Sequence, residues 1–446
     1  MKISIFRILT VLLVWIPEDG GVAAAGKLKQ MQQRRRGWRR LADETFYPSY
    51  RDSMPSSLQY RKTSAIFNVL KFGAKGDGRT DDTKAFEAAW LAACKLEAST
   101  MVVPKGSVFL VKPVSFSGPD CGWNIVFQLD GKIIAPTDSK SWGSGLLQWL
   151  EFTKLNGITI RGNGVIDGQG SVWWTDSPTS TKPTAVRFYG SSDVTVTGIT
   201  IQNSQQTHLK FDNCQSVQVF DITVSSPGDS PNTDGIHLQN SQDVTIHSSK
   251  LACGDDCVSI QTGCSGVNIQ NVDCGPGHGI SIGSLGKDNT KACVSNITVS
   301  DTKIHDSLNG VRIKTWQGGS GSVQRVTFAN IQVSNVKTAI MIDQYYCDGS
   351  KCRNMTSAVA VSGISYRNIR GTYTVNPIHF ACSDTSPCTD VTLDTIQLQP
   401  VQENHEPFCW NTYGELKTST NPPIDCLMVA KPSKKQAQSN YDSCEV

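Results

Sequence analysis

The chain has 446 residues, of which 38% are hydrophobic, and a formal net charge of +3. Its 15 cysteines are too few per residue for a small scaffold held together by disulfides. The positive charge is concentrated between Lys27 and Arg40, where seven basic residues and no acidic ones occur, so the rest of the chain carries 35 basic against 39 acidic residues. The body of the protein is therefore mildly acidic.

The first 25 residues have the features of a cleaved secretory signal. Lys2 and Arg7 precede an apolar run from Ile8 to Ile16, and residues 22–25 offer the small side chains that a signal peptidase accepts. The run is far shorter than the roughly 20 apolar residues of a membrane-spanning helix, and no second candidate follows it. The sequence predicts a soluble, secreted protein without a membrane anchor.

Residues 26–63 form a basic arm that contains RRRGWRR at positions 34–40. The arm has little periodic apolar pattern, so we expect it to be poorly ordered. A basic run can bind nucleic acid or another polyanion, but this one has no series of interleaved aromatic residues, only Trp38. In a secreted protein a solvated or processed linker is the favoured interpretation, and we expect no nucleic-acid partner.

One amphipathic helix is predicted over residues 80–97. Phe86, Ala89, Trp90 and Ala93 recur there at helical spacing after an Asp/Thr start. Almost everything after this helix alternates apolar and polar residues in short runs that are typical of strands. Six such runs have starts 23 to 29 residues apart: 194–204, 217–226, 244–253, 267–274, 294–307 and 323–336.

This period predicts a stacked repeat, in which each unit buries its apolar face against the next. The units contain strands and turns but no helical stretch, which disfavours leucine-rich and helical repeats, and a propeller would need about 40 residues per blade. Coils of roughly 25 residues with two or three strands fit an all-β fold, the right-handed parallel β-helix. We expect one such domain at residues 64–430, with the predicted helix capping its first coil and a C-terminal tail at 431–446.

Several cysteines come in close pairs that an oxidising compartment would join across short loops. These pairs are Cys257 with Cys274, Cys347 with Cys352, Cys382 with Cys388, and Cys409 with Cys426. The odd count leaves at least one thiol free or bound to another chain. Zinc is disfavoured, because no CxxC pair or Cys/His cluster has zinc spacing. Sequons at Asn296 and Asn354 predict surface glycosylation in a secreted protein.

Two adjacent aspartates, Asp255 and Asp256, occupy the segment GDDC at 254–257. In a regular strand one of them would point into the interior, where an unpaired charge is costly. Asp234 precedes Asp256 by 22 residues and His278 follows it by 22, so each interval is close to one coil. We expect these side chains to stack on neighbouring rungs of one face, about 4.8 Å apart.

One coil further along, Arg312 and Lys314 lie two residues apart on a predicted strand and therefore share a face. The sequence thus predicts three carboxylates, one imidazole and two cations along one wall of the solenoid. Such a cluster can be catalytic. It can also be a solvated polar face or a turn at a strand end, and spacing alone leaves these alternatives open.

The chain resembles the polygalacturonases, which are pectin-hydrolysing glycosidases built on a right-handed β-helix. The resemblance lies in the order and spacing of four signature segments: NTDGIH, GDDC, GHGISIG and RIK. Two further segments are similar to the plant branch of that family, FGAKGDGRTDD at 72–82 and GNGVIDGQGSVWW at 162–174. The resemblance covers roughly residues 64–430. It implies hydrolysis of α-1,4-galacturonosyl linkages without metal or other cofactor, and a bridge between Cys257 and Cys274 beside the GDDC turn.

Glycoside hydrolysis needs one carboxylic acid to protonate the leaving oxygen and one carboxylate to act on water or on carbon. The resemblance assigns the general acid to Asp255 and the activation of water to Asp234 with Asp256, as in an inverting reaction. It implies that His278 supports the acid or a sugar hydroxyl. Like charges this close should raise at least one carboxyl pKa in the cluster.

Each galacturonate unit of the substrate carries a carboxylate, which the resemblance assigns to Arg312 and Lys314 near the cleavage point. It also implies that Asn232 lines the site and that Tyr346 contacts the next sugar, with Tyr345 as the alternative. The expected partner is pectic polysaccharide. The expected state is a monomer secreted to the cell wall.

Other functions on the same fold remain open. A pectate lyase would use calcium and an arginine base, and the aspartates with His278 could serve as metal ligands. A catalytically inactive pectin-binding wall protein would need a defect elsewhere, because the catalytic positions are filled. Within the family, rhamnogalacturonan and xylogalacturonan are alternative substrates, although the paired cations favour homogalacturonan.

Overall fold

The computed structural model describes residues 65–142, 148–174, 182–348, 352–403 and 405–429, together with Cys444. The described residues fall within one compact unit of the chain. The predicted signal segment 1–25 and basic arm 26–63 lie outside the described residues, and so does the predicted tail 431–446 apart from Cys444. Within the described ranges, no helix is both long enough and apolar enough to cross a membrane.

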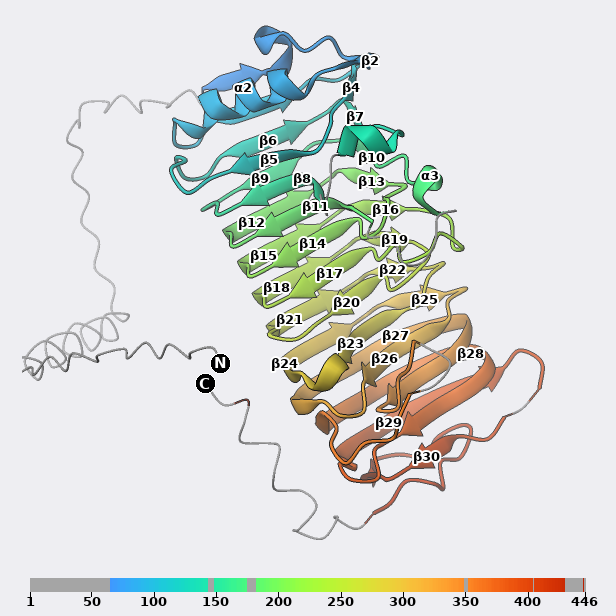
Figure 1. Ribbon diagram of the computed structural model, residues 1–446. Coiled ribbons are helices and arrows are strands. Elements are labelled where there is room, and N and C mark those ends of the chain that lie inside the picture. The colour runs from blue at the N-terminus through green and yellow to red at the C-terminus, as the bar shows by residue number, and fades with distance from the viewer. Residues whose placement is uncertain are drawn as a thin grey trace, which may run out of the picture. The chain divides into compact units, whose positions relative to one another are not determined.

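The described helices are few and short. The longest is α2 (Thr83–Cys94), and the others are α3 (Ser171–Trp174) and the 3-10 helices η1 (Val69–Phe72), η2 (Ser139–Trp142) and η3 (Lys287–Asn289). Helix α2 lies across the N-terminal end of the solenoid (Figure 1) and buries Phe86, Ala89, Trp90 and Ala93, so the predicted cap is confirmed.

Helix α2 is shorter than the predicted range 80–97 at both ends. Residues 77–81 form strand β2 instead, and the carboxylate of Asp82 accepts hydrogen bonds from the backbone amides of Lys75 and Gly76 at 2.6 and 3.1 Å. At its other end, the carbonyl of Cys94 accepts the amide of Gly122 at 2.7 Å. These non-local contacts fix the helix ends, and periodicity alone does not reveal them.

The strands stack into three parallel ladders that run the length of the solenoid (Figure 1). The first ladder contains β5 (Val114–Ser117), β8 (Gln148–Thr153), β11 (Thr184–Tyr189), β14 (Leu209–Asp212), β17 (Ile236–Gln239), β20 (Val258–Ile260), β23 (Ile280–Leu285), β26 (Asn309–Thr315), the last residues of β27 (Ser320–Asp343) and β28 (Ala360–Ala381), and β30 (Phe408–Trp410).

The second ladder contains β1 (Ile66–Asn68), β3 (Thr100–Val103), β6 (Val126–Leu129), β9 (Thr159–Arg161), β12 (Ser192–Thr197), β15 (Gln215–Phe220), β18 (Gln242–His247), β21 (Ser265–Gln270), β24 (Lys291–Ser300), the first residues of β27 and β28, β29 (Cys388–Pro400) and β31 (Thr412–Leu416). The third contains β2 (Asp77–Asp81), β4 (Val108–Leu110), β7 (Lys132–Ile134), β10 (Val165–Asp167), β13 (Thr200–Gln202), β16 (Thr223–Ser225), β19 (Lys250–Ala252), β22 (Asp273–Cys274), β25 (Lys303–His305) and later parts of β27, β28 and β29.

The fold is therefore the predicted right-handed parallel β-helix, with three strands to a full coil. Successive coils stay in register because the corner between the second and third ladders has the same geometry each time. At this corner one residue per coil adopts a left-handed conformation, with φ between 50° and 57°, and most of these residues are Asn or Asp, which tolerate that region. They are Asp221, Ser248, Asn271, Asp301, Asn330, Asn368 and Thr395.

The interior is filled by side chains that stack from coil to coil. Under the first ladder, the rings of Phe116, Phe152, Phe188 and Phe211 follow one another with centroids 4.9 to 5.1 Å apart. All four rings are buried, and the next rungs continue with Leu and Ile. Outward-facing residues alternate with these, so the inward row fixes which residues of the first ladder face solvent.

Six disulfides connect the described residues. The four predicted from close spacing are present, Cys257–Cys274, Cys347–Cys352, Cys382–Cys388 and Cys409–Cys426. Two more, Cys94–Cys121 and Cys293–Cys444, were not predicted because their sequence separations are 27 and 151. The free thiols of the described residues, Cys214, Cys253 and Cys264, are all buried. Both predicted glycosylation sites, Asn296 and Asn354, have exposed side chains.

Candidate active site

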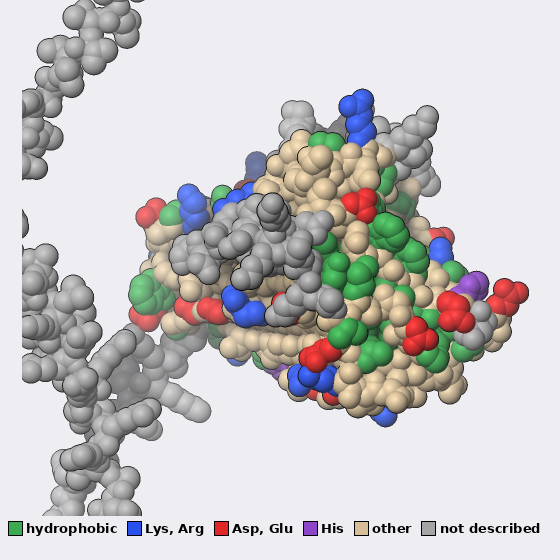
Figure 2. Space-filling model, turned by 90° about the horizontal axis from the view of Figure 1, so that it is seen from below, with side chains coloured by type: hydrophobic (Ala, Val, Ile, Leu, Met, Phe, Trp, Pro, Cys, Tyr) green, Lys and Arg blue, Asp and Glu red, His purple; other side chains and the backbone are tan. Residues whose placement is uncertain are grey.

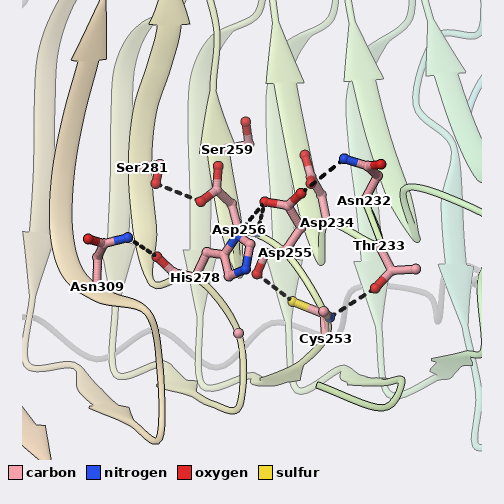
Figure 3. A network of polar contacts seen from close by, with 12 residues as sticks. Asn232, Thr233, Asp234, Cys253, Asp255, Asp256, Ser259, His278, Ser281 and Asn309 are labelled. Carbon is pink, nitrogen blue, oxygen red and sulfur yellow. Dashed lines mark hydrogen bonds and ion pairs between the residues drawn. The ribbon is translucent and has the colours of Figure 1, made fainter. Parts of the chain in front are cut away.

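The predicted cluster lies where turns lead into the first ladder. Asp234, Asp256 and His278 each stand two residues before a core residue of β17, β20 or β23. Those core residues, Ile236, Val258 and Ile280, pair with one another in register. The three side chains consequently stack on neighbouring rungs, as the spacing predicts, and Figure 3 shows them converging on one side of the strands.

The segment GDDC is a turn between β19 and β20, so neither aspartate has to point into the core. The turn passes so close to the preceding coil that a Cβ at Gly254 would meet the carbonyl oxygen of Ser230 at 1.8 Å. The amide of Gly254 donates to the Thr233 hydroxyl at 2.9 Å, and the amide of Asp256 donates to Asp255 Oδ1 at 2.8 Å. This tight turn presents both carboxylates to the same side.

Asp256 is the most enclosed member of the cluster, with 2% of the residue exposed. Its Oδ1 accepts hydrogen bonds from Arg312 Nη2 at 2.7 Å and from the Ser281 hydroxyl at 2.7 Å, and its Oδ2 accepts from Lys314 Nζ at 2.9 Å. The two predicted cations are themselves only 7% exposed. A buried charge is tolerable when it is paired and hydrogen-bonded in this way.

Asp255 pairs with the imidazole instead. His278 Nδ1 lies 2.9 Å from Asp255 Oδ1, and the amide of His278 donates to the carbonyl of Asp255 at 2.7 Å. The side-chain nitrogen Nδ2 of Asn232 lies 3.4 Å from Asp255 Oδ2, on the side facing solvent. The structure thus brings Asn232 and His278 to the two oxygens of the same carboxylate (Figure 3).

Asp234 has a partner that the sequence analysis did not select. Its Oδ2 lies 3.1 Å from Nδ1 of His237 in β17. Burial, with the charge of Lys210, lowers the pKa of His237 to about 3, so this imidazole is neutral at ordinary pH. His237 belongs to the segment NTDGIH, and strand alternation from the buried Ile236 already indicates that it faces outward.

The carboxyl groups differ in their affinity for a proton. Burial, followed by the charges of Asp255 and Asp256, raises the pKa of Asp234 well above its usual range. Burial acts in the same direction on Asp255, but the hydrogen bond and charge of His278, with the charge of Lys314, lower the pKa of Asp255 on balance. The sequence predicts at least one raised carboxyl pKa in the cluster, and in the structure Asp234 has it.

An aromatic pair borders the cations on the C-terminal side. The Tyr346 ring centroid lies 5.3 Å from Lys314 Nζ and 5.4 Å from the ring of Trp316, which it meets edge-on. Tyr345, the alternative considered for this position, receives a hydrogen bond on its hydroxyl from the amide of Asp384 at 3.0 Å. Of the two tyrosines, Tyr346 is therefore the one that contacts the cationic part of the cluster.

The cluster also brings possible cation ligands together. One ligand atom from each of Asp255, Asp256 and His278 lies within 4.8 Å of the others. Calcium prefers six to eight oxygen ligands, and both Asp256 oxygens already accept hydrogen bonds from Arg312 and Lys314, whose positive charges oppose a metal ion. This set of donors does not suit calcium.

The chain has well-defined relatives. The model of glycosyl hydrolases family 28 matches residues 94–416. A probable polygalacturonase of Arabidopsis thaliana is 42% identical over 379 residues, which cover 82% of this chain and 85% of the relative. A polygalacturonase of Persea americana is 44% identical over 341 residues, which cover 74% and 73%.

Solved structures agree on the fold. A polygalacturonase from Erwinia carotovora superposes with a TM-score of 0.66 at 23% identity, covering 82% of this chain and all of that one. An endo-xylogalacturonan hydrolase from Aspergillus tubingensis gives a TM-score of 0.68 at 24% identity, covering 80% of this chain. At these identities the likeness concerns the β-helix itself.

We predict that Asp234→Asn stabilises the protein at neutral pH. A carboxyl group whose pKa is raised on folding favours the folded state less as the pH rises above its unfolded pKa of about 4, because the unfolded carboxyl then ionises freely in water, whereas the buried one must take up a proton or ionise next to like charges. The amide removes that penalty. Denaturant midpoints of variant and wild type should coincide near pH 4 and separate as the pH rises, in favour of the variant.

The matched control is Asp229→Asn, which changes an exposed aspartate of the loop before the site. Its midpoint should follow that of the wild type at every pH. A destabilised Asp234→Asn protein at neutral pH would contradict the raised pKa.

Proposed function

The chain belongs to glycosyl hydrolases family 28, and from this membership and the geometry of its site we propose that it hydrolyses α-1,4-galacturonosyl linkages of pectin. The observation that carries the proposal is the division among three neighbouring carboxylates. Asp256 is paired with two cations, Asp255 contacts an imidazole, and burial beside the other two carboxylates raises the pKa of Asp234. Glycoside hydrolysis needs such a difference, since one group must give a proton while another accepts one.

We assign the general acid to Asp255 and propose that substrate binding loads it with a proton. Burial already acts to raise the pKa of Asp255, and the charges of His278 and Lys314 oppose it. A galacturonate carboxylate next to Lys314 would offset one of those charges, and the bound sugar would exclude water. Both effects favour the protonated acid, so the proton held by Asp234 moves to Asp255.

The same transfer prepares the base. Once Asp234 is ionised, it stands with Asp256 as a carboxylate pair able to orient and deprotonate a water molecule. Asp255 protonates the glycosidic oxygen as the bond to the anomeric carbon breaks, and water attacks that carbon from the opposite face. The proton released by water returns to Asp234, which restores the resting state.

Arg312 and Lys314 have a second task beside the pairing with Asp256. Arg312 uses Nε on Ser281 and Nη2 on Asp256, and Lys314 uses one donor on Asp256. A guanidinium has five N–H donors and an ammonium three, so donors remain on both for a substrate carboxylate. Tyr346, which already contacts Lys314, is the group we assign to the adjoining sugar ring.

The wider setting of the enzyme follows from its substrate and its cysteines. Six disulfides fit an oxidising compartment, so we propose that the protein is secreted and acts as a monomer on homogalacturonan of the cell wall. The sequons at Asn296 and Asn354 would be glycosylated on that route, and their exposure leaves room for a glycan.

The first test separates hydrolysis from elimination. Purified protein incubated with de-esterified polygalacturonate should release reducing ends without the ultraviolet absorbance of an unsaturated product, and a chelator should leave the rate unchanged. The reason is that the aspartates supply acid and base themselves. Unsaturated product, with activity lost in chelator and restored by calcium, would make the protein a lyase. Binding without turnover would make it an inactive pectin-binding protein.

The second test concerns the acid. Asp255→Asn should lower kcat by about 10² to 10⁴, because general acid catalysis contributes that much and an amide cannot donate the same proton. Binding of an oligogalacturonide should weaken far less. Asp229→Asn serves as the control and should keep the wild-type rate. A variant at position 255 with near wild-type turnover would refute the assignment.

The third test is stereochemical. If Asp255 and the pair Asp234 and Asp256 act on opposite faces of the sugar with water between, the reaction inverts the anomeric carbon. Proton NMR of the first product should then show the β-anomer before mutarotation. An initial α-anomer would mean that one of these aspartates attacks carbon directly.

A further inference from the structure

Two rows of outward-facing residues continue from the catalytic cations toward the C-terminal end of the first ladder. In the first row, Arg312 pairs in register with Met341, Met341 pairs with His379, and His379 pairs with Phe408. The second row lies two residues further along each strand. It starts at Lys314 and ends, by the same pairings, at Trp410. Both aromatic residues thus lie three rungs beyond the cations, about 14 Å at 4.8 Å per rung.

These two aromatic side chains are exposed and yet held in place. Phe408 is 45% exposed and stacks on the ring of His379, with centroids 5.0 Å apart and planes 22° from parallel. Trp410 is 51% exposed, and its Nε1 donates a hydrogen bond to Asp384 Oδ1 at 2.8 Å. Rings that are fixed beforehand lose little conformational entropy when a ligand packs on them.

The C-terminal end of the solenoid carries other exposed apolar side chains, and Figure 2 shows hydrophobic groups among the polar ones on this end. They include Val401, Leu416, Met428 and Val429. Phe408 and Trp410 differ from these in position, because they occupy the two rows that lead from the catalytic cations. A ligand that packs on Phe408 and Trp410 would therefore lie along the path of the substrate.

We propose that Phe408 and Trp410 form a platform for a distal sugar unit of the pectic chain that is being cleaved, an inference that rests on the proposed function. The apolar C–H face of a pyranose ring packs on aromatic rings of this kind, which offer large contact areas at low entropic cost. A polymer that follows the first ladder past Lys314 meets these rings after several units.

The platform recognises the sugar ring and not its charge. In these two rows beyond Arg312 and Lys314, the described residues include no Lys or Arg, and the acidic Asp343 lies between Lys314 and the platform. Asp384 adds a second carboxylate beside Trp410. A unit bound there consequently gains nothing from its carboxylate, so a methyl ester on that unit does not weaken binding.

The experiment compares chain lengths. Trp410→Ala and Phe408→Ala should raise KM for polygalacturonate about threefold to tenfold, with kcat unchanged, because one ring contact is worth that much. KM for short oligogalacturonides that end before the platform should not change. Trp410→Phe, which keeps an aromatic ring, should recover most of the loss. Trp123→Ala removes a tryptophan that is 62% exposed between β5 and β6, far from these rows, and is the matched control.

Two further readouts distinguish the platform from the cations. The loss caused by Trp410→Ala should be the same at low and high salt and on partly methyl-esterified substrate, whereas a charge contact weakens with salt. Equal losses on short and long substrates, or a loss that Trp123→Ala reproduces, would overturn the platform. If the wild type has no turnover, the proposed function fails, and quenching of tryptophan fluorescence by polygalacturonate, compared between wild type and Trp410→Ala, still tests the platform.

Discussion

The pairing of each coil with the next, residue for residue, is the constraint on which the site depends. Ile236, Val258 and Ile280 share one line of the ladder, and this alone sets Asp234, Asp256 and His278 on consecutive rungs. A slip of one residue would turn the inward row outward and separate the carboxylates. The buried aromatic stack and the left-handed corner residues that maintain register therefore also position the proposed catalytic groups.

The three carboxylates of the cluster differ in how closely cations hold them. Asp256 is held by two cations, and Arg187, two coils before the site, is itself paired with Glu151 at 3.1 Å and Asp212 at 2.6 Å. Among the described residues, Asp234 and Asp255 form no ion pair with a Lys or Arg; their closest basic partners are the imidazoles of His237 and His278. In the proposed mechanism, these are the two groups between which the proton moves.

Much of this was predictable from the sequence, and the failures share a cause. The 23- to 29-residue period, the cap and the stacking of Asp234, Asp256 and His278 follow from local patterns that repeat once per coil. The Cys293–Cys444 link and the ion pairs of Asp256 depend on which distant side chains meet, and spacing gives only a shared face. A raised carboxyl pKa is predicted, but its assignment to Asp234 depends on burial, which no motif encodes.

The solenoid also explains how one wall can combine groups of opposite character. Each rung supplies its outward residues independently of its neighbours, provided that the inward row stays apolar. Lys210, one rung before His237, adds positive charge on the N-terminal side of the aspartates, and the structure gives it no ion pair among the described residues. Phe408 and Trp410 add apolar surface on the C-terminal side. In the proposed function, a polymer lying along the wall would meet the positive charge of Lys210, the carboxylates and the two aromatic rings in that order.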